Sequence, residues 1–470
     1  MLFSSSVFLF LFLPAVLFCY YIPFRGRRQG QNLLLLAASV LFYAFGEPWF
    51  VLVMIGSIVA NWAFGLWAGR ARAAGRSTKT AVVCTAVFNL GILFIFKYLV
   101  FVLTNLNLAG IPFTIPVIGL PIGISFFTFK AMSYVLDVAR GDTEAQPSLF
   151  KVGLYISLFP QLLAGPITRY TTMSDEIDHR RETWADFSSG AGRFLIGMGK
   201  KVLLSNQLAV VADMAFRGGR PSSAAFAWLG AVCYALQLYF DFAGYSDMAI
   251  GMGRMFGFHF LENFNYPCIA SSVTEFWRRW HISLSTWFRD YVYIPLGGSR
   301  ASKWKTARNL FVVWFLTGIW HGANWTFLVW GLLYYVLLML ERFAGLGRGW
   351  PKPLGRLYTF VSFVLVFVVF RAVSLGEAMT YYQALLGIGV PALSADFTLY
   401  LREYAPIIAL SFACAAPTAT WARKKLSGWN AGRLLPLWDG AGAVCLLAVF
   451  VLSVAFIVKG TYNPFIYFNF

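Results

Sequence analysis

The chain has 470 residues, of which 59% are hydrophobic, 18% aromatic and only 12% charged. Soluble domains carry about twice that share of charge, and a soluble globule of this composition would expose large apolar patches, so the composition indicates a membrane protein. The net charge of +18 comes from basic residues lying between apolar runs, which favours cytoplasmic loop bias over nucleic-acid binding.

About a dozen apolar segments follow one another, judged by the roughly 20 apolar residues that a membrane-spanning helix needs. No long polar stretch separates them, so we expect a single integral membrane domain over residues 1–470 with an all-α polytopic fold of about 11–12 transmembrane or re-entrant helices. The segments lie at residues 4–24, 32–43, 49–67, 81–103, 111–136, 149–163, 194–214, 225–252, 310–341, 357–370, 404–421 and 439–458.

The first segment lacks a small-residue cleavage site, so we interpret it as a retained span. The basic residues at 25–28 and 70–79 should be cytoplasmic, which places the N-terminus outside. Segment 149–163 contains Pro160 and precedes Gly165 and Pro166, a pattern typical of a re-entrant or half-buried element. The six cysteines form no CxxC pair, which supports neither a disulfide framework nor a metal site.

Segment 271–300 reads SSVTEFWRRWHISLSTWFRDYVYIPLGGSR and differs from its surroundings. Ser272 and Glu275 form a capping-box start, and Pro295 with the following glycines should end the helix. Aromatic and leucine side chains at helical spacing predict one apolar face, made of Trp277, Trp280, Leu284, Trp287 and Tyr291, with Arg278, His281 and Ser285 on another. Such a helix suits a tilted or interfacial position, and a plain interfacial anchor is an equally good interpretation of the periodicity.

The run at 310–341 contains LTGIWHGANWTFLVWG, with His321 well inside an almost uncharged stretch. An ionisable group at that depth is costly and usually faces a cavity, a partner or a substrate path. Gly318 and Gly322 form a small-xxx-small pair that lets another helix approach beside the histidine. A neutral histidine bonded to a neighbouring helix remains the structural alternative.

The chain has four histidines. His179 lies in a charged loop and should be solvated, while His259 is expected to be structural. His281 and His321 lie among aromatic residues, where desolvation lowers the pKa of an imidazole and keeps it available as a general base.

The stretch FWRRWHISLSTWFRDYVYIPLGG followed by NLFVVWFLTGIWHGANWTFLVWG resembles the signature of the membrane-bound O-acyltransferase superfamily. It is most similar to the bacterial alginate O-acetylase-like branch, as are PIGISFFTFKAMSYVLDV, FPQLLAGPITRY and LQLYFDFAGYSDMAIGMG. The resemblance implies a ring of helices around a central funnel, with a catalytic core at about residues 115–345. His321 matches the family's catalytic histidine, and His281 matches the second histidine of the bacterial branch.

The resemblance also implies an O-acetyltransferase of the bacterial inner membrane. Its acetyl group would come from a cytoplasmic thioester, here acetyl-CoA as a donor substrate, with no bound cofactor and no metal. The acceptor would be an exported polysaccharide, with alginate as the first guess, reached through an extracytoplasmic SGNH-type acetyltransferase partner. The lipid bilayer is a further expected partner, and no nucleic-acid partner is expected.

Acyl transfer to a hydroxyl needs a base beside that hydroxyl and a site that excludes water. The chain has no GxSxG elbow, so a serine acyl-enzyme of that type is not indicated. Trp320, Asn324 and Arg278 are candidate donors to the developing oxyanion and bind substrate in this interpretation. The tail TYNPFIYFNF resembles an acyl-transfer motif of some relatives, with Tyr467 as a candidate acyl relay; an aromatic interfacial anchor is its alternative.

Other functions remain open from the sequence. A D-alanyl or peptidoglycan acyltransferase would belong to the same superfamily. A polytopic transporter or flippase of a lipid-linked sugar would line its path with charged residues, for which Asp241 and Asp247 are the only hints. A non-catalytic scaffold is the third possibility.

Overall fold

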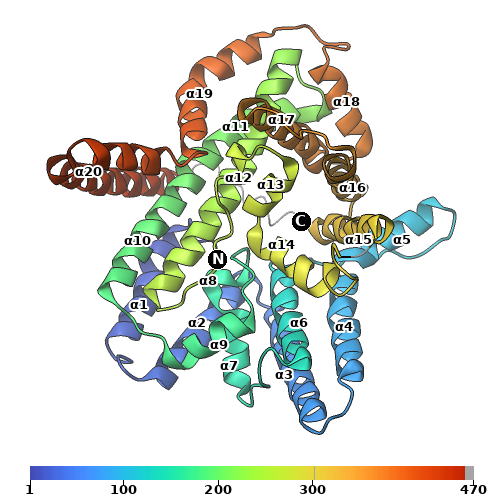
Figure 1. The fold of residues 1–470 in the computed structure, drawn as a ribbon, viewed down its shortest axis with the longest axis vertical. Helices are drawn as coiled ribbons and strands as arrows, with labels where there is room; N and C mark the ends of the chain where they lie inside the picture. The colour runs from blue at the N-terminus through green and yellow to red at the C-terminus, as the bar shows by residue number, and fades with distance from the viewer. Residues whose placement is uncertain (301, 461–470) are drawn as a thin grey trace. The chain divides into compact units, whose positions relative to one another are not determined.

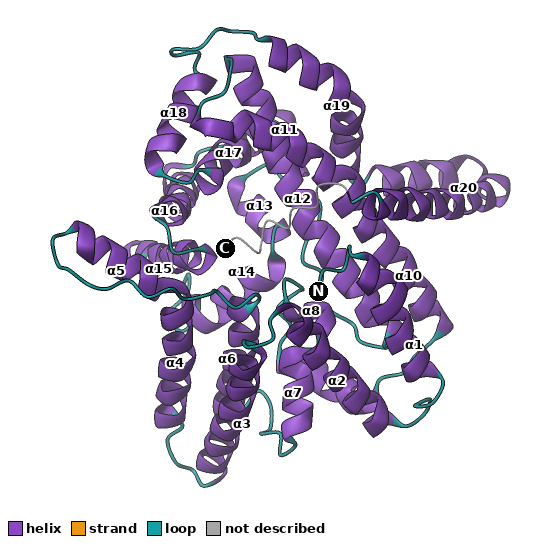
Figure 2. Cartoon of the chain, turned by 180° about the vertical axis from the view of Figure 1, so that it is seen from behind, coloured by secondary structure: helices purple, strands orange, loops and turns teal. Residues whose placement is uncertain are grey.

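The computed structural model describes residues 1–300 and 302–460, apart from the side chains of residues 428–434. Within these ranges every regular element is a helix and none is a strand (Figures 1 and 2). The expected all-α polytopic fold is therefore confirmed. Tyr467 lies outside the described residues.

Seven of the described helices are long and apolar enough to cross a membrane. A further bent pair, 395–414 with 418–427, would make eight if it forms one span. Several of the shorter predicted segments fold as helices below the spanning length, so the number of helices that meet the length criterion is smaller than the number of apolar segments.

The chain divides into two compact units. Unit 1 comprises Met1–Phe194 and Met248–Leu261, and unit 2 comprises Leu195–Asp247 and Glu262–Phe470. The helices of unit 1 are α1 (Leu13–Tyr21), α2 (Arg28–Gly46), α3 (Val51–Ala73), α4 (Lys79–Leu93), α5 (Leu99–Leu108), α6 (Ile124–Arg140), α7 (Leu149–Ser157), α8 (Phe159–Leu162), α9 (Tyr170–His179) and most of α10 (Trp184–Gly199).

Within unit 1, α3 packs against α4 and α6. Asn61 and Asn89 are fully buried and exchange two amide hydrogen bonds of 3.1 and 2.8 Å between α3 and α4. Reciprocal pairing satisfies both side chains in apolar surroundings, where an unpaired amide is costly.

Two predicted segments of unit 1 differ from single spans. Segment 111–136 was expected to be one apolar element, but no helix begins before Ile124. Pro112, Pro116 and Pro121 account for this, since proline lacks the backbone N–H that a helix interior needs. Segment 149–163 forms the two short, largely buried helices α7 and α8, which agrees with the prediction of a non-spanning element.

Unit 2 contains the residues that the sequence analysis selects. Its helices are α11 (Asn206–Phe216), most of α12 (Ala224–Met255), α13 (Val273–Arg279), α14 (Ile282–Phe288), α15 (Lys303–His321), α16 (Trp325–Met339), α17 (Lys352–Arg371), α18 (Leu375–Leu385), α19 (Ala395–Cys414) and α20 (Thr418–Val458).

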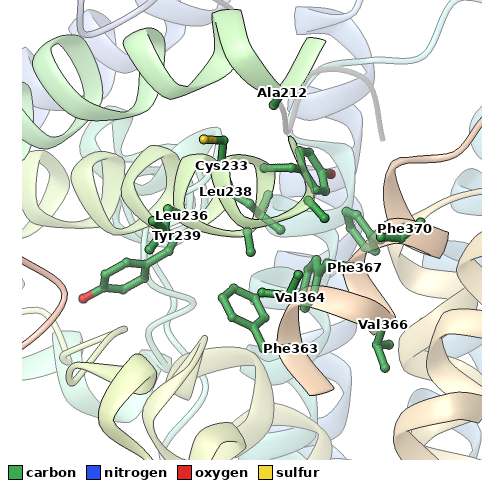
Figure 3. Packing of buried hydrophobic residues seen from close by; sticks show 14 of the residues in the cluster. Ala212, Cys233, Leu236, Leu238, Tyr239, Phe363, Val364, Val366, Phe367 and Phe370 are labelled. Atoms are coloured by element: carbon green, nitrogen blue, oxygen red, sulfur yellow. The ribbon is translucent and has the colours of Figure 1, made fainter. Parts of the chain in front are cut away.

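The core of unit 2 is built largely from aromatic and aliphatic side chains of α12, α13, α16 and α17. Figure 3 shows Phe363, Val364 and Phe367 of α17 turned toward α12, which contributes Leu238. The Phe363 and Phe367 rings lie 4.9 Å apart in an edge-to-face arrangement, the geometry that aromatic pairs prefer. Trp330 and Phe370 of this core lie against His321.

Candidate active site

His281 stands at a break between two short helices. The predicted single helix through 272–294 is wrong, because α13 ends at Arg279 and α14 begins at Ile282. His281 takes left-handed backbone angles, φ 43° and ψ 55°, which are uncommon for a residue other than glycine and cost about 1–3 kcal/mol. Surrounding contacts must therefore hold this conformation in place.

The N-terminal cap predicted for this segment is confirmed. The Ser272 hydroxyl accepts a 3.0 Å hydrogen bond from the Glu275 backbone N–H. The Glu275 carboxylate accepts from the Ser271 backbone instead of the Ser272 backbone. Glu341 also accepts from the backbone N–H groups of Val273 and Thr274, so two carboxylates stabilise the start of α13.

The residues before α13 hold the break at His281. The Asn263 carbonyl accepts a 3.0 Å hydrogen bond from the Ile282 N–H, and the Arg279 carbonyl accepts one of 2.9 Å from Asn265. The Asn263 side chain is fully buried, with its Oδ1 3.1 Å from His281 Nδ1. Backbone and side-chain contacts from one short loop therefore fix both the chain and the ring at His281.

The His281 ring is 1% exposed. The Phe242 ring of α12 meets it edge-on at 4.6 Å, and the Trp320 ring of α15 lies 6.0 Å away. Burial lowers the pKa of His281 to about 3, since low-polarity surroundings disfavour the charged imidazolium. His281 is therefore neutral at physiological pH.

His321 is the last residue of α15. The expected continuous element at 310–341 is wrong: the chain breaks at residues 322–324 and returns as α16, so the segment is a hairpin of two packed helices. Asn324 causes the restart, because its side chain accepts a 3.2 Å hydrogen bond from the Thr326 N–H as an N-cap. Its Nδ2 donates to the Val373 carbonyl at 2.9 Å.

Gly318 allows α15 and α16 to pack closely, as predicted. A β-carbon at Gly318 would lie 2.7 Å from the Phe327 carbonyl oxygen and 3.2 Å from the Leu328 Cα, and one at Gly331 would lie 2.5 Å from the Trp314 carbonyl oxygen. Only glycine permits these backbone approaches. The close packing of α15, which ends at His321, against α16 therefore depends on small residues.

Three aromatic rings surround the His321 imidazole. Trp320, Trp330 and Phe370 meet it nearly perpendicularly, with ring centroids 5.0, 4.8 and 5.3 Å away. These rings come from α15, α16 and α17, and His321 is 4% exposed. An imidazole in such surroundings is shielded from bulk water, which is the environment that acyl transfer requires.

Trp320 links the two histidines, because its ring contacts both imidazoles. The structure thus brings together His281, Trp320 and His321, the predicted core of the site. Arg278 lies exposed on α13, and the Asn324 side chain caps α16 and binds the Val373 carbonyl, so the structure does not bring these two candidates to the imidazoles.

The other histidines lie in unit 1 and differ in character. His179 is 74% exposed beside Asp175, which agrees with a solvated residue. His259 is 51% exposed, with Nδ1 2.8 Å from the Glu176 carboxylate. Burial among aromatic rings therefore separates His281 and His321 from the rest.

Sequence reasoning missed three residues of the site: Asn263, Trp330 and Phe370. Asn263 lies in an irregular loop where no periodicity applies. Trp330 and Phe370 read as ordinary core residues of apolar helices. The spacing from His321 to Trp330 carries a signal only once the chain is known to reverse at 322–324.

A cavity of about 620 Å³ lies toward the other end of the α15–α16 hairpin. Leu310 on α15 and Leu338 on α16 line it, together with Glu341, Arg342 and Arg348. Leu310 precedes His321 by 11 residues, or about 16 Å along a helix. Guanidinium groups are suited to binding phosphate.

Comparison with known proteins agrees with this site. Residues 123–382, which include both buried histidines, match the model of the MBOAT, membrane-bound O-acyltransferase family. The chain is 46% identical over 402 residues to a probable alginate O-acetylase of Pseudomonas aeruginosa, covering 84% of this chain and 76% of that protein. A probable alginate O-acetylase of Azotobacter vinelandii is 45% identical over 426 residues, covering 88% and 82%.

The similarity extends to two other kinds of enzyme. A peptidoglycan O-acetyltransferase of Helicobacter pylori is 32% identical over 518 aligned positions, covering 100% of this chain and 98% of that protein. A teichoic acid D-alanyltransferase of Bacillus subtilis is 30% identical over 261 residues, covering 52% and 65%. The family model, the relatives and the helical fold together show that this multi-pass membrane protein is an acyltransferase that belongs to the membrane-bound O-acyltransferase family, in its alginate O-acetylase-like branch.

Proposed function

We propose that this enzyme transfers an acetyl group from a cytoplasmic thioester, acetyl-CoA, across the bacterial inner membrane for O-acetylation of an exported polysaccharide. The observation that carries the proposal is the buried, aromatic-enclosed pair of imidazoles at His281 and His321. His321 acts as the base that takes a proton from an acceptor hydroxyl, so that the oxygen can attack the acyl carbon.

Alginate is the first acceptor to test, because the relatives at 45–46% identity carry that name. Peptidoglycan is the second candidate, because the Helicobacter pylori enzyme aligns with all of this chain. An extracytoplasmic SGNH-type acetyltransferase would complete the transfer. Arg342 and Arg348, which line the cavity together with Glu341, support an anionic donor approaching unit 2.

The two acidic residues that suggested a transporter have a structural explanation. Asp241 and Asp247 form 2.6 Å ion pairs with Lys201 and Lys200. Both carboxylates are therefore accounted for by contacts between helical segments of unit 2, and a substrate path is not needed to explain them.

The donor is tested with purified protein in lipid vesicles and acetyl-CoA labelled in the acetyl group. The proposal predicts label on alginate oligosaccharides when the partner enzyme is present, and much less label from D-alanyl thioesters. Label that appears on lipid, or no label from acetyl-CoA, would contradict it.

In cells, a Tyr467→Phe variant tests the acyl relay that we also propose: acetylation should fall, and normal acetylation would exclude the relay.

A further inference from the structure

We infer that Asn263 is a positioning residue that holds His281 in a single tautomer, with the proton on Nδ1 and the lone pair on Nε2. This inference rests on the proposed function for its consequence in catalysis, but its structural content can be measured separately. It concerns a residue in the loop between α12 and α13.

The Asn263 side chain has a defined orientation. Its Oδ1 lies 3.2 Å from the Ser283 backbone nitrogen, and a backbone N–H can only donate. The atom facing it must therefore be the amide oxygen, since the reversed amide would place two donors against each other. The Ser283 hydroxyl also donates to this oxygen at 2.9 Å.

The other end of the amide agrees with this assignment. Asn263 Nδ2 donates to the Ser246 hydroxyl of α12 at 3.0 Å. Asn263 and Ser246 are 0% and 2% exposed, so water does not compete for these bonds. Rotating the amide would place its NH2 group against the Ser283 backbone N–H, with two donors facing each other.

The tautomer of His281 follows directly. Nδ1 lies 3.1 Å from the Asn263 oxygen, which can accept but cannot donate, so Nδ1 must carry the hydrogen. Nε2, itself buried, then carries the lone pair. His281 thus presents an accepting nitrogen to the site, able to receive a hydrogen bond or a proton from a substrate group.

Three uncharged groups face the ring: the Phe242 ring from α12, the Trp320 ring from α15 and the Asn263 amide. None of these three titrates at physiological pH. An Asn263→Asp variant would therefore introduce a carboxylate that keeps the acceptor, stabilises the imidazolium and raises the pKa of His281.

The experiment uses the full-length protein in lipid nanodiscs with 15N-labelled histidine. With four histidines in the chain, a His281→Asn spectrum identifies the His281 signals, and two-bond proton–nitrogen correlations report which ring nitrogen is protonated. The wild type should show a protonated Nδ1 at neutral pH. A protonated Nε2 with a bare Nδ1 would overturn the inference.

The variants separate positioning from folding. Asn263→Ala should mix the tautomers and lower kcat about 10- to 100-fold with little change in the KM for the donor. Asn263→Asp should restore the Nδ1–H tautomer and most activity at alkaline pH, with activity lost at a higher pH on acidification than in the wild type. An unchanged tautomer in Asn263→Ala, or an unshifted acid limb in Asn263→Asp, would overturn the inference.

Asn309→Ala serves as the matched control. Asn309 is equally buried, and its Nδ2 donates to the Leu296 and Gly298 carbonyls. This variant should leave the His281 tautomer unchanged, and a change would show that any lost buried amide perturbs the ring. If the proposed function fails because His321 is dispensable, the tautomer measurement still stands.

Discussion

At position 281 the backbone conformation and the side-chain chemistry place separate requirements on the residue. The backbone needs a residue that tolerates left-handed angles, which asparagine does better than alanine. The proposed chemistry needs the imidazole side chain. A substitution that tolerates the left-handed backbone but lacks an imidazole therefore tests the role of the side chain alone.

We expect both His281→Asn and His281→Ala to lose most acetylation, because neither supplies an imidazole. The alanine variant should be less stable than the asparagine variant by about 1 kcal/mol, since alanine is strained in the left-handed region. Activity assays and thermal unfolding in detergent check this prediction. Equal stability of the two variants would mean that the left-handed conformation costs nothing at this position.

Burial of His281 also predicts a pH-dependent stability. The pKa falls from the ordinary value of 6.5 to about 3, so between these values the unfolded chain binds the proton that the folded chain excludes. The contribution of His281 to the free energy of unfolding should thus be constant above about pH 6.5 and fall as the pH drops below it. The comparison with His281→Asn isolates this effect: the difference between the two proteins should shift in the variant's favour at acidic pH. A pH-independent difference would contradict a depressed pKa.

The residue types around each histidine, and its position within apolar or aromatic segments, were enough to select His281 and His321 from four histidines. Their environment was not predictable to the same degree. The Asn263 contact joins residues 18 positions apart through a loop, and the Phe370 ring reaches His321 from a different helix. Contacts of this kind depend on tertiary packing and leave no local pattern.

The hairpin of α15 and α16 is the element that determines where His321 lies. A Gly318→Ala substitution would place a methyl group 2.7 Å from a backbone oxygen of α16, which cannot move without separating the helices. We expect a loss of about 1–3 kcal/mol in the free energy of unfolding, as for other overpacked sites, together with reduced acetylation. Thermal unfolding and activity measure both effects.

Gly440→Ala in α20 is the control for helix propensity. No atom lies within 4 Å of a β-carbon at Gly440, so this variant should be neutral or slightly stabilising. If Gly318→Ala behaves in the same way, then close packing at that glycine does not hold the hairpin.

Helices with long apolar runs were predictable as elements, but their breaks were not. Periodicity predicted one helix through His281, whereas the loop contacts of Asn263 and Asn265 impose a break between Arg279 and Ile282. The reversal at 322–324 could be suspected from Asn324, a good N-cap residue. The position of such a turn cannot be predicted within an apolar run that lacks prolines and charges, because the residues on both sides of the turn are equally apolar.

At the scale of the molecule, a buried ion pair connects helical segments of unit 2. The Lys201 and Asp241 side chains are 2% and 0% exposed and 2.6 Å apart. Removing one member leaves the other as a buried charge, so Asp241→Asn or Lys201→Met should destabilise the protein by about 3–5 kcal/mol. A double Lys201→Met/Asp241→Leu variant should recover much of that loss.

The exposed pair Arg423 and Asp439 provides the comparison, at 57% and 58% exposure. Removing either side chain should change stability by about 0–1 kcal/mol. Unfolding measurements on both pairs in the same detergent separate burial from charge. Equal effects at the two sites would show that burial of the Lys201–Asp241 pair has no energetic consequence.

Composition and motifs predicted the membrane class, the all-α fold and the acyltransferase family of the whole chain. In the described part of the chain, fewer helices reach the spanning length than there are apolar segments, because apolar character continues through α7 and α8 and through the proline-rich stretch before α6. Span length depends on where helices end, and loops that are buried can be as apolar as spans.

The central claim is that the His321 imidazole is the base for acyl transfer. The most direct measurement compares polymer acetylation in cells that carry the wild type, His321→Gln or His321→Ala, at matched membrane protein levels and matched polymer export. We expect both variants to export normal amounts of polymer with acetylation reduced at least about 100-fold, the order expected for loss of a general base. Acetylation that persists near the wild-type level in either variant, with the protein folded, would contradict it.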